Sequence, residues 1–193
     1  MIRTKTTRLS PLACALIGFA LIAATAIVLH AMGQPLICRC GTVKLWQGDV
    51  MGPENSQQLI DWYSPSHLIH GLLFYALLWL VARRRPRGLR ALIALLLECG
   101  WEILENSPII IDRYREATIS LGYRGDSVIN SVSDITFMLI GFALAARLPV
   151  AVSIALAVLL ELAVGYMIRD NLTLNIIMLI WPLEAIKTWQ AGG

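Results

Sequence analysis

Long apolar stretches separated by short polar segments dominate this sequence. They lie at about residues 12–32, 65–82, 91–111, 126–146, 150–168 and 172–189. An α-helix needs roughly 17–25 predominantly apolar residues to cross a bilayer, and each stretch falls near that length. The sequence therefore predicts an all-α fold, a polytopic transmembrane bundle of five or six helices, formed by a single domain over residues 1–193.

The composition excludes an ordinary soluble domain. Hydrophobic residues make up 57% of the chain and charged residues only 15%, with a mean hydropathy of +0.66. Soluble domains contain about 25% charged residues. A chain this apolar cannot cover its surface with polar groups, so we expect the lipid bilayer as its partner. With a net charge of only +3, we expect no nucleic acid.

The first and last stretches each leave an alternative open. Residues 12–32 could be a cleaved signal peptide, but their apolar run of about 20 residues exceeds the usual ~7–15, which favours an uncleaved anchor. Residues 172–189 contain Pro182, which interrupts a helix. This last segment is therefore either a full span or a kinked, partly interfacial helix.

The distribution of basic residues predicts the orientation. Placing the arginine run Arg83–Arg90 in the cytoplasm puts the N-terminus, Arg147 and Lys187 on the same side. That side then holds ten of the 16 Lys and Arg residues, as the positive-inside rule requires. We expect a multi-pass protein of a bacterial cell inner membrane, with both termini cytoplasmic and an outer loop over residues 33–64.

Several ionisable residues lie inside the predicted spans. Each costs about 2.5–3.5 kcal/mol to insert, even on the lenient scale, so each needs a partner or a function. Glu98, Glu102 and Glu105 share one face of their helix, because they are spaced by four and then three residues. Those that lie more than one turn from a helix end, such as Glu98 and Asp134, are expected to contact histidine or arginine.

The predicted topology brings many of these groups to one depth, near the outer surface. We predict an outward-facing polar cavity that binds an amphiphile with an anionic headgroup, such as an anionic lipid or a lipid-linked envelope precursor. Arginine side chains suit a phosphate in that role. The expected lining residues are His67, His70, Glu102, Glu105, Asp126 and Asn130, and the expected headgroup contacts are Arg113, Arg115, Arg124 and Arg169. Taken singly, each of these residues could equally cap a helix or snorkel to the surface.

Other functions fit the same residues. An intramembrane hydrolase or transferase would use His70 with Glu102 or Asp126 as acid and base. A small proton-coupled transporter would need Glu98, Asp134 and Glu161 along a path. A structural or assembly subunit would need no ligand. The sequence assigns no catalytic residue, no cofactor and no oligomeric state.

A metal site is not predicted. The Glu-x-x-His pair that bundle metal sites often use is absent. Cys38 and Cys40 have no second pair with zinc-site spacing. They lie in the outer loop, where they form either a redox-labile pair or a loop staple.

Four strings carry a resemblance that covers the chain from Ile37 onward. The chain resembles an uncharacterised family of bacterial multi-pass inner-membrane proteins of unknown function. The resemblance implies a cell-membrane protein and no established activity. The strings are ICRCGTVKLW at 37–46, WEILENSP at 101–108, GDSVINS at 125–131 and RDNLTLN at 169–175.

A remote resemblance to the VanZ-like membrane proteins, which are linked to glycopeptide resistance, concerns fewer residues. His70 is similar to the histidine that opens one span in that family. Glu102 and Glu105 resemble its Glu-x-x-Gln, with Glu in place of Gln, and Asp126 with Asn130 match its Asp-x-x-x-Asn. The family's lysine before the histidine, the glycine after the asparagine and the arginine before the aspartate have no counterparts here.

Overall fold

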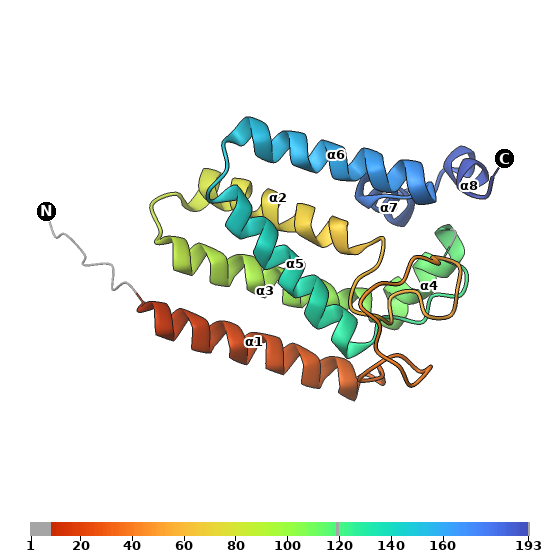
Figure 1. Ribbon diagram of the computed structural model, residues 1–193, viewed down its shortest axis with the longest axis horizontal. Coiled ribbons are helices and arrows are strands. Elements are labelled where there is room, and N and C mark those ends of the chain that lie inside the picture. Colours follow the sequence, from red (N-terminus) through yellow and green to blue (C-terminus); the bar gives the residue numbers. More distant parts are fainter. Residues whose placement is uncertain (1–8, 119, 193) are drawn as a thin grey trace, which may run out of the picture.

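The computed structural model describes residues 9–118 and 120–192, and every regular element in them is helical. The predicted all-α bundle is confirmed. The helices are α1 (Pro11–Ala31), α2 (Ser64–Ala82), α3 (Arg87–Glu105), α4 (Pro108–Ala117), α5 (Val128–Ala145), α6 (Val150–Ile168), α7 (Leu172–Ile180) and α8 (Glu184–Gln190). The five long helices run side by side, and the short ones gather at one end of the bundle (Figure 1).

Two glycines allow α2 and α5 to pack at the centre of the bundle. A Cβ atom on Gly71 would overlap the backbone carbonyl of Met138, and a Cβ atom on Gly141 would overlap that of Leu68. Only glycine permits the two backbones to approach so closely, which is the usual reason for small residues where membrane helices meet. This contact is the most extensive between any two helices of the described chain.

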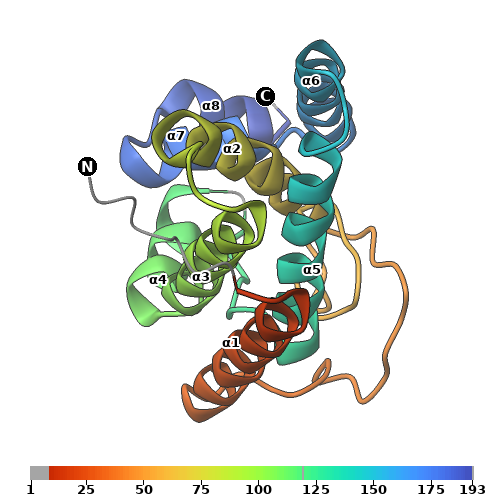
Figure 2. The same cartoon turned by 90° about the vertical axis from the view of Figure 1, so that its left-hand side faces the viewer.

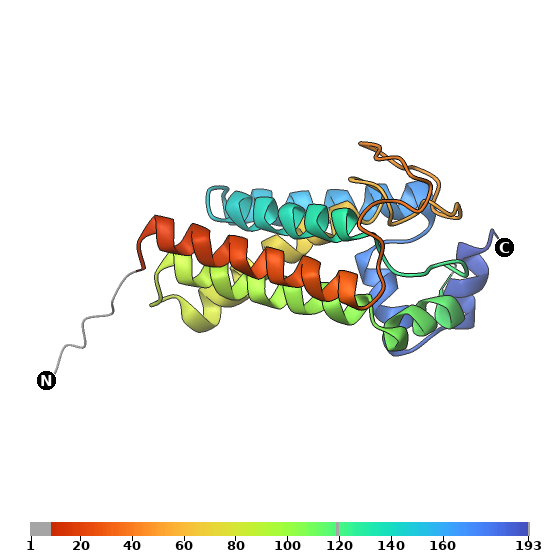
Figure 3. The same ribbon diagram turned by 90° about the horizontal axis from the view of Figure 1, so that it is seen from below.

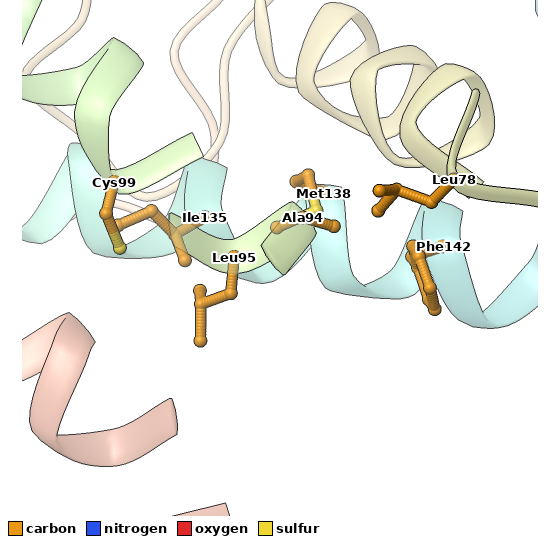
Figure 4. Close-up of a cluster of buried hydrophobic side chains, with 7 residues drawn as sticks. All are labelled: Leu78, Ala94, Leu95, Cys99, Ile135, Met138 and Phe142. Atoms are coloured by element: carbon orange, nitrogen blue, oxygen red, sulfur yellow. The ribbon is translucent and has the colours of Figure 1, made fainter. Parts of the chain in front are cut away.

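Apolar side chains of α2, α3 and α5 form the core beside this contact. The fully buried members include Ala94 of α3 and both Ile135 and Met138 of α5. Leu78 comes from α2, and Phe142 lies opposite it, one turn further along α5 (Figure 4). The core thus ties together the three helices that also carry the ionisable residues.

Four helices are long and apolar enough to cross a membrane: α1, α2, α5 and α6. They indicate a membrane protein. Helices α1 and α6 lie at opposite edges of the bundle (Figures 1 and 2). Their outward faces carry large apolar side chains such as Phe19, 73% exposed, and Leu162, 67% exposed. Helix α3 has 19 residues, like α2, but bears three glutamates.

The predicted span 91–111 is two helices. Helix α3 ends at Glu105, and α4 begins at Pro108. A proline disfavours helical backbone in the residue before it, and Ser107 is extended accordingly, with ψ of 151°. The break falls at the polar residues 105–107, which lie between two apolar segments and were too few to divide the predicted span.

The predicted span 172–189 is also two helices, α7 of 9 residues and α8 of 7 residues. At 1.5 Å per residue neither can cross a bilayer. Both lie with α4 at the end of the bundle opposite the start of α1 (Figures 1 and 3). The described ends of the chain are thus at opposite ends of the bundle, which differs from the prediction of termini on one side. Arg3, Lys5 and Arg8, counted in that prediction, lie outside the described residues.

The outer loop between α1 and α2 folds over this same end. Its backbone reaches the start of α5, where Ser127 N–H donates to Ser56 O at 3.0 Å and Val128 N–H donates to Pro35 O at 2.8 Å. Cys38 and Cys40 form a disulfide inside the loop, which is compatible with both alternatives, a redox-labile pair and a structural cross-link of the loop. The loop therefore covers the end of the bundle at which the polar residues of α2, α3 and α5 lie.

Candidate functional site

His67, in the first turns of α2, lies among carboxylates from two other helices. Its Nδ1 is 2.7 Å from Glu98 Oε1 and 3.4 Å from Glu102 Oε1 on α3, and its Nε2 is 3.9 Å from Asp134 Oδ2 on α5. The imidazole is buried. Glu98, Glu102 and Asp134 were expected to have histidine or arginine partners, and His67 is the partner that they contact.

His70 completes this group, because it lies three residues along the same face of α2. Its Nδ1 is 3.1 Å from Glu98 Oε2. The ring packs edge-on against that of His67, with centroids 5.2 Å apart, and stacks on Phe74 at 5.8 Å. We call His67, His70, Glu98, Glu102 and Asp134 the His67 cluster.

Glu102 is the least satisfied member of the His67 cluster. Its side chain is completely buried, and neither carboxylate oxygen has a hydrogen-bond partner. Among the residues that the structure describes, no Lys or Arg lies within ion-pair distance of any carboxylate in the cluster. Burying several carboxylates without a fixed cation is costly, so the cluster is short of positive charge.

Asp126 and Asn130 lie above the cluster and hold the loops in place. Asp126 accepts hydrogen bonds from Asn106 Nδ2 at 2.8 Å and from the Tyr123 hydroxyl at 2.9 Å. Asn130 Nδ2 donates to Gln58 O at 2.8 Å. Burial raises the pKa of Asp126 to about 6, against the opposing effect of its hydrogen bonds. Both side chains are therefore engaged in hydrogen bonds that attach a loop to the bundle.

A small inner cavity of about 30 Å³ lies between the His67 cluster and Asp126. It has room for about one or two water molecules. His67, Glu105, Asp126 and Asp134 all line it. Of the six residues predicted to line one cavity, these include His67, Glu105 and Asp126, whereas His70, Glu102 and Asn130 do not line it. Its other lining residues are Asn55, Ser56, Tyr63, Tyr114, Ser120 and Tyr123.

A larger outer cavity of about 580 Å³ adjoins the inner one. The two share Asn55, Ser120 and Tyr123 in their walls. The outer cavity is formed by the loop between α1 and α2 and by the segment before α5, and its cationic residues are Arg39 and Arg124. An anionic group can therefore be attracted to the outer cavity, whereas the carboxylates of the inner cavity would repel it.

The four arginines predicted to contact a headgroup do not gather in one place. Arg124 lines the outer cavity. Arg169 lines a separate space of about 660 Å³ together with Lys187. Arg113 Nε donates to Leu179 O at 2.8 Å, and Arg115 Nε donates to Tyr123 O at 2.6 Å, so both guanidinium groups tie chain segments together.

Some residues of the site were not in the sequence-predicted set. Glu98 and Asp134 were expected to have a histidine or arginine partner but were not among the predicted lining residues, and both contact His67 directly. Tyr114 donates its hydroxyl to Glu105 Oε1 at 3.0 Å, and Asn106 holds Asp126. Because Tyr123 and Ser120 lie in an irregular segment, no helical periodicity in the sequence could have placed them at the cavity.

Comparisons with known proteins cover nearly the whole chain. A family model described as a protein of unknown function (DUF2585) matches residues 29–192. A UPF0314 protein of Rhizobium etli strain CIAT 652 is 57% identical over 173 residues, 90% of this chain and 89% of the relative. Those of Paracoccus denitrificans and Novosphingobium aromaticivorans are 57% and 56% identical, over 90% and 92% of both chains.

No solved structure matches this chain. The resemblance to VanZ-like proteins is not shown by these comparisons and stays a hypothesis. The family model spans all of the His67 cluster and both cavities, and the match to the uncharacterised family that the four sequence strings predicted is confirmed. The chain therefore belongs to the bacterial UPF0314 family, whose family model carries the description of a protein of unknown function.

Proposed function

We propose that this protein binds an amphiphile with an anionic headgroup at the outer face of a bacterial inner membrane. The amphiphile would be an anionic lipid or a lipid-linked envelope precursor. Its headgroup would enter the outer cavity, where Arg124 and Arg39 supply positive charge. Arginine presents several N–H donors in a fixed plane, which suits the oxygens of a phosphate.

The observation that carries this proposal is the shared wall of the two cavities. Asn55, Ser120 and Tyr123 border both the cationic outer cavity and the inner cavity that reaches His67. A headgroup in the outer cavity would thus lie directly above the His67 cluster. The apolar side chains of Met51 and Leu121, each 64% exposed, line the outer cavity and offer contact to the apolar part of the ligand.

The charge balance of the outer cavity supports an anionic ligand. Its acidic residue Glu54 is engaged by Lys44, whose Nζ lies 2.7 Å from Glu54 Oε2. The hydrogen bond from Lys44 lowers the pKa of Glu54, which keeps that carboxylate ionised and paired. Because Glu54 is paired with Lys44, Arg39 and Arg124 give the outer cavity a net positive charge.

The proposed orientation follows the basic residues at the other end of the bundle. The basic run Arg83–Arg90 forms the connection between α2 and α3 and the first turn of α3, and Arg147 follows α5. The positive-inside rule favours a cytoplasmic location for both connections. The loop at residues 33–63 and helix α8 then face the periplasm. Reporter fusions after Arg87 and after Gly193 test this orientation: we expect cytoplasmic signals only from the first, and the reverse pattern would overturn it.

Lipid binding can be measured on the full chain after purification in detergent. The lipid probes are vesicles of phosphatidylcholine that contain 20% phosphatidylglycerol or an undecaprenyl phosphate. The double variant Arg39→Gln/Arg124→Gln should bind about tenfold more weakly or worse, since two charge-assisted contacts are lost. Arg147→Gln is the matched control, because Arg147 lies at the opposite end and donates only to Ala143 O of its own helix. Equal binding by the double variant and the control would refute the proposal.

A second candidate function is hydrolysis of a lipid-linked phosphoanhydride. It is favoured by the position of His67, whose Nδ1 faces Glu98 while its Nε2 faces Asp134 beside the inner cavity. An imidazole oriented by a carboxylate is a common general base. Release of inorganic phosphate from undecaprenyl pyrophosphate, abolished in His67→Gln, is the expected result. No release by wild-type protein that binds the lipid would exclude this activity.

A further inference from the structure

We infer that the His67 cluster is a binding site for a divalent transition-metal ion, with His67, His70, Glu98 and Glu102 as its ligands. Imidazole nitrogens and carboxylate oxygens are the ligands that Zn²⁺ takes in catalytic sites. This assignment does not depend on the proposed lipid binding, because none of these four side chains lines the outer cavity. It differs from the expectation from sequence, which predicted no metal ligands.

The distances between the ligand atoms are those of a compact site. Glu98 Oε1 is 2.7 Å from His67 Nδ1, and Glu98 Oε2 is 3.1 Å from His70 Nδ1. Glu102 Oε1 is 3.4 Å from His67 Nδ1. A tetrahedral ion bound at ~2.0–2.2 Å separates its ligand atoms by roughly 3.3–3.6 Å. His67, His70 and Glu98 offer ligand atoms that all lie within 4.8 Å of one another, and so do His67, Glu102 and Glu105, so His67 is common to both sets.

Glu102 supplies an independent observation. Its carboxylate is completely buried beside His67, and both of its oxygens lack a hydrogen-bond partner. Buried polar groups are almost always paired, so an unpaired carboxylate needs an explanation such as an ion. A divalent cation would pair with these oxygens. It would also offset the charge of the neighbouring carboxylates, for which the described chain provides no Lys or Arg.

The helices explain why the sequence pattern concealed this site. Bundle metal sites are commonly recognised by a Glu-x-x-His pair on one helix. Here each helix contributes one kind of ligand, with the two histidines spaced by three residues on α2 and the two glutamates spaced by four on α3. Both spacings place the pair on one face. Only the packing of α2 against α3 brings the two faces together.

The group of metal-ligand side chains that does not contain His67 does not compete with this site. Cys38, Cys40 and Glu54 lie close together in the outer loop. The two cysteines are joined in a disulfide, and Glu54 is held by Lys44. Neither thiolate nor a free carboxylate is therefore available there.

The test uses the full chain purified without a histidine tag, stripped with a chelator and loaded with Zn²⁺ or Co²⁺ alone. We expect about one metal ion per chain by elemental analysis after loading and desalting. We also expect visible Co²⁺ absorption bands that Zn²⁺ displaces. Less than one tenth of an ion per wild-type chain, or no Co²⁺ bands, would overturn the inference without recourse to any variant.

Variants then assign the ligands. His70→Ala and Glu102→Gln should each weaken Zn²⁺ binding at least tenfold. His30→Ala is the matched control, because His30 lies on α1 and contacts Gln34 O rather than the cluster. Loss of binding in His30→Ala to the same extent, or full retention in both ligand variants, would show an adventitious ion and reject the site. Lipid binding measured in parallel distinguishes failure of this inference from failure of the proposed function.

Discussion

His67 Nδ1 and Glu98 Oε1 lie 2.7 Å apart and join α2 to α3 in the interior of the bundle. Glu98 also contacts His70 through its other oxygen, at 3.1 Å. One carboxylate thus serves two imidazoles, and the side chain is completely buried. The relation between the two helices depends on a polar contact as well as on the apolar core beside it.

Replacing Glu98 with Leu should therefore destabilise the protein. Both histidines would lose their acceptor inside the bundle, and breaking a buried pair typically costs about 3–5 kcal/mol. The free energy of unfolding in detergent mixtures measures the effect. Glu116→Leu, at an exposed position of α4, should change it by less than about 0.5 kcal/mol. A similar small effect from both variants would show that the contact contributes little.

The close approach of α2 and α5 predicts that Gly141→Ala is harmful. The new methyl group would overlap the backbone carbonyl of Leu68, and overpacking of this kind costs about 1–3 kcal/mol. Gly100→Ala is the matched control, because no atom lies within 4 Å of a Cβ there and alanine favours a helix. Thermal unfolding of both variants should show a lower midpoint only for Gly141→Ala; equal midpoints would contradict the packing.

Because the carboxyl group of Asp170 is buried, we expect the stability of the protein to depend on pH. It lies between α6 and α7, accepts hydrogen bonds from Tyr63, Asn171, Asn175 and Gln190, and is 1% exposed. Burial raises its pKa to about 6, although these hydrogen bonds oppose the shift. Because the folded pKa exceeds the unfolded value, the fold favours the protonated form. Stability should fall as pH rises from about 4 to about 6.

The expected contribution of Asp170 is about 3 kcal/mol across that range. Unfolding midpoints measured from pH 4 to pH 8 should show a smaller slope in Asp170→Asn than in wild type, since asparagine does not titrate. The variant should also be less stable at low pH, because the amide nitrogen cannot accept the bonds that the carboxyl group accepts. A pH profile parallel to that of wild type would refute the assignment.

We expect replacement of Asn106 to destabilise the end of the bundle that the loops cover. Its Nδ2 donates to Asp126 Oδ2 at 2.8 Å, and its Oδ1 accepts from Asp126 N–H at 2.6 Å. Asn106→Ala removes both bonds and leaves a buried carboxyl group short of a donor, at a cost of about 2–3 kcal/mol. Ser107→Ala, next along the chain but more exposed, is the control. Faster proteolysis of the segment 120–127 in Asn106→Ala alone is the expected observation.

The fold class and the membrane-compatible helices could be predicted from the order of apolar and polar residues. Stretches such as 12–32 and 150–168 are apolar on all sides, and only a helix satisfies its backbone groups in lipid. The costly residues Glu98 and Asp134 were also recognisable from the sequence. A buried charge needs a partner, and histidines were among the few candidates. Their contacts with His67 follow from that requirement.

The tertiary structure alone decided where the remaining residues lie. Hydropathy merges α3 with α4 and α7 with α8, because it measures composition and not the backbone direction at Pro108 or Pro182. It therefore could not show that α8 packs at the same end as the outer loop. Nor could it separate Arg124, which lines the outer cavity, from Arg113, which binds a backbone carbonyl. Such outcomes depend on contacts between distant segments, which local patterns do not encode.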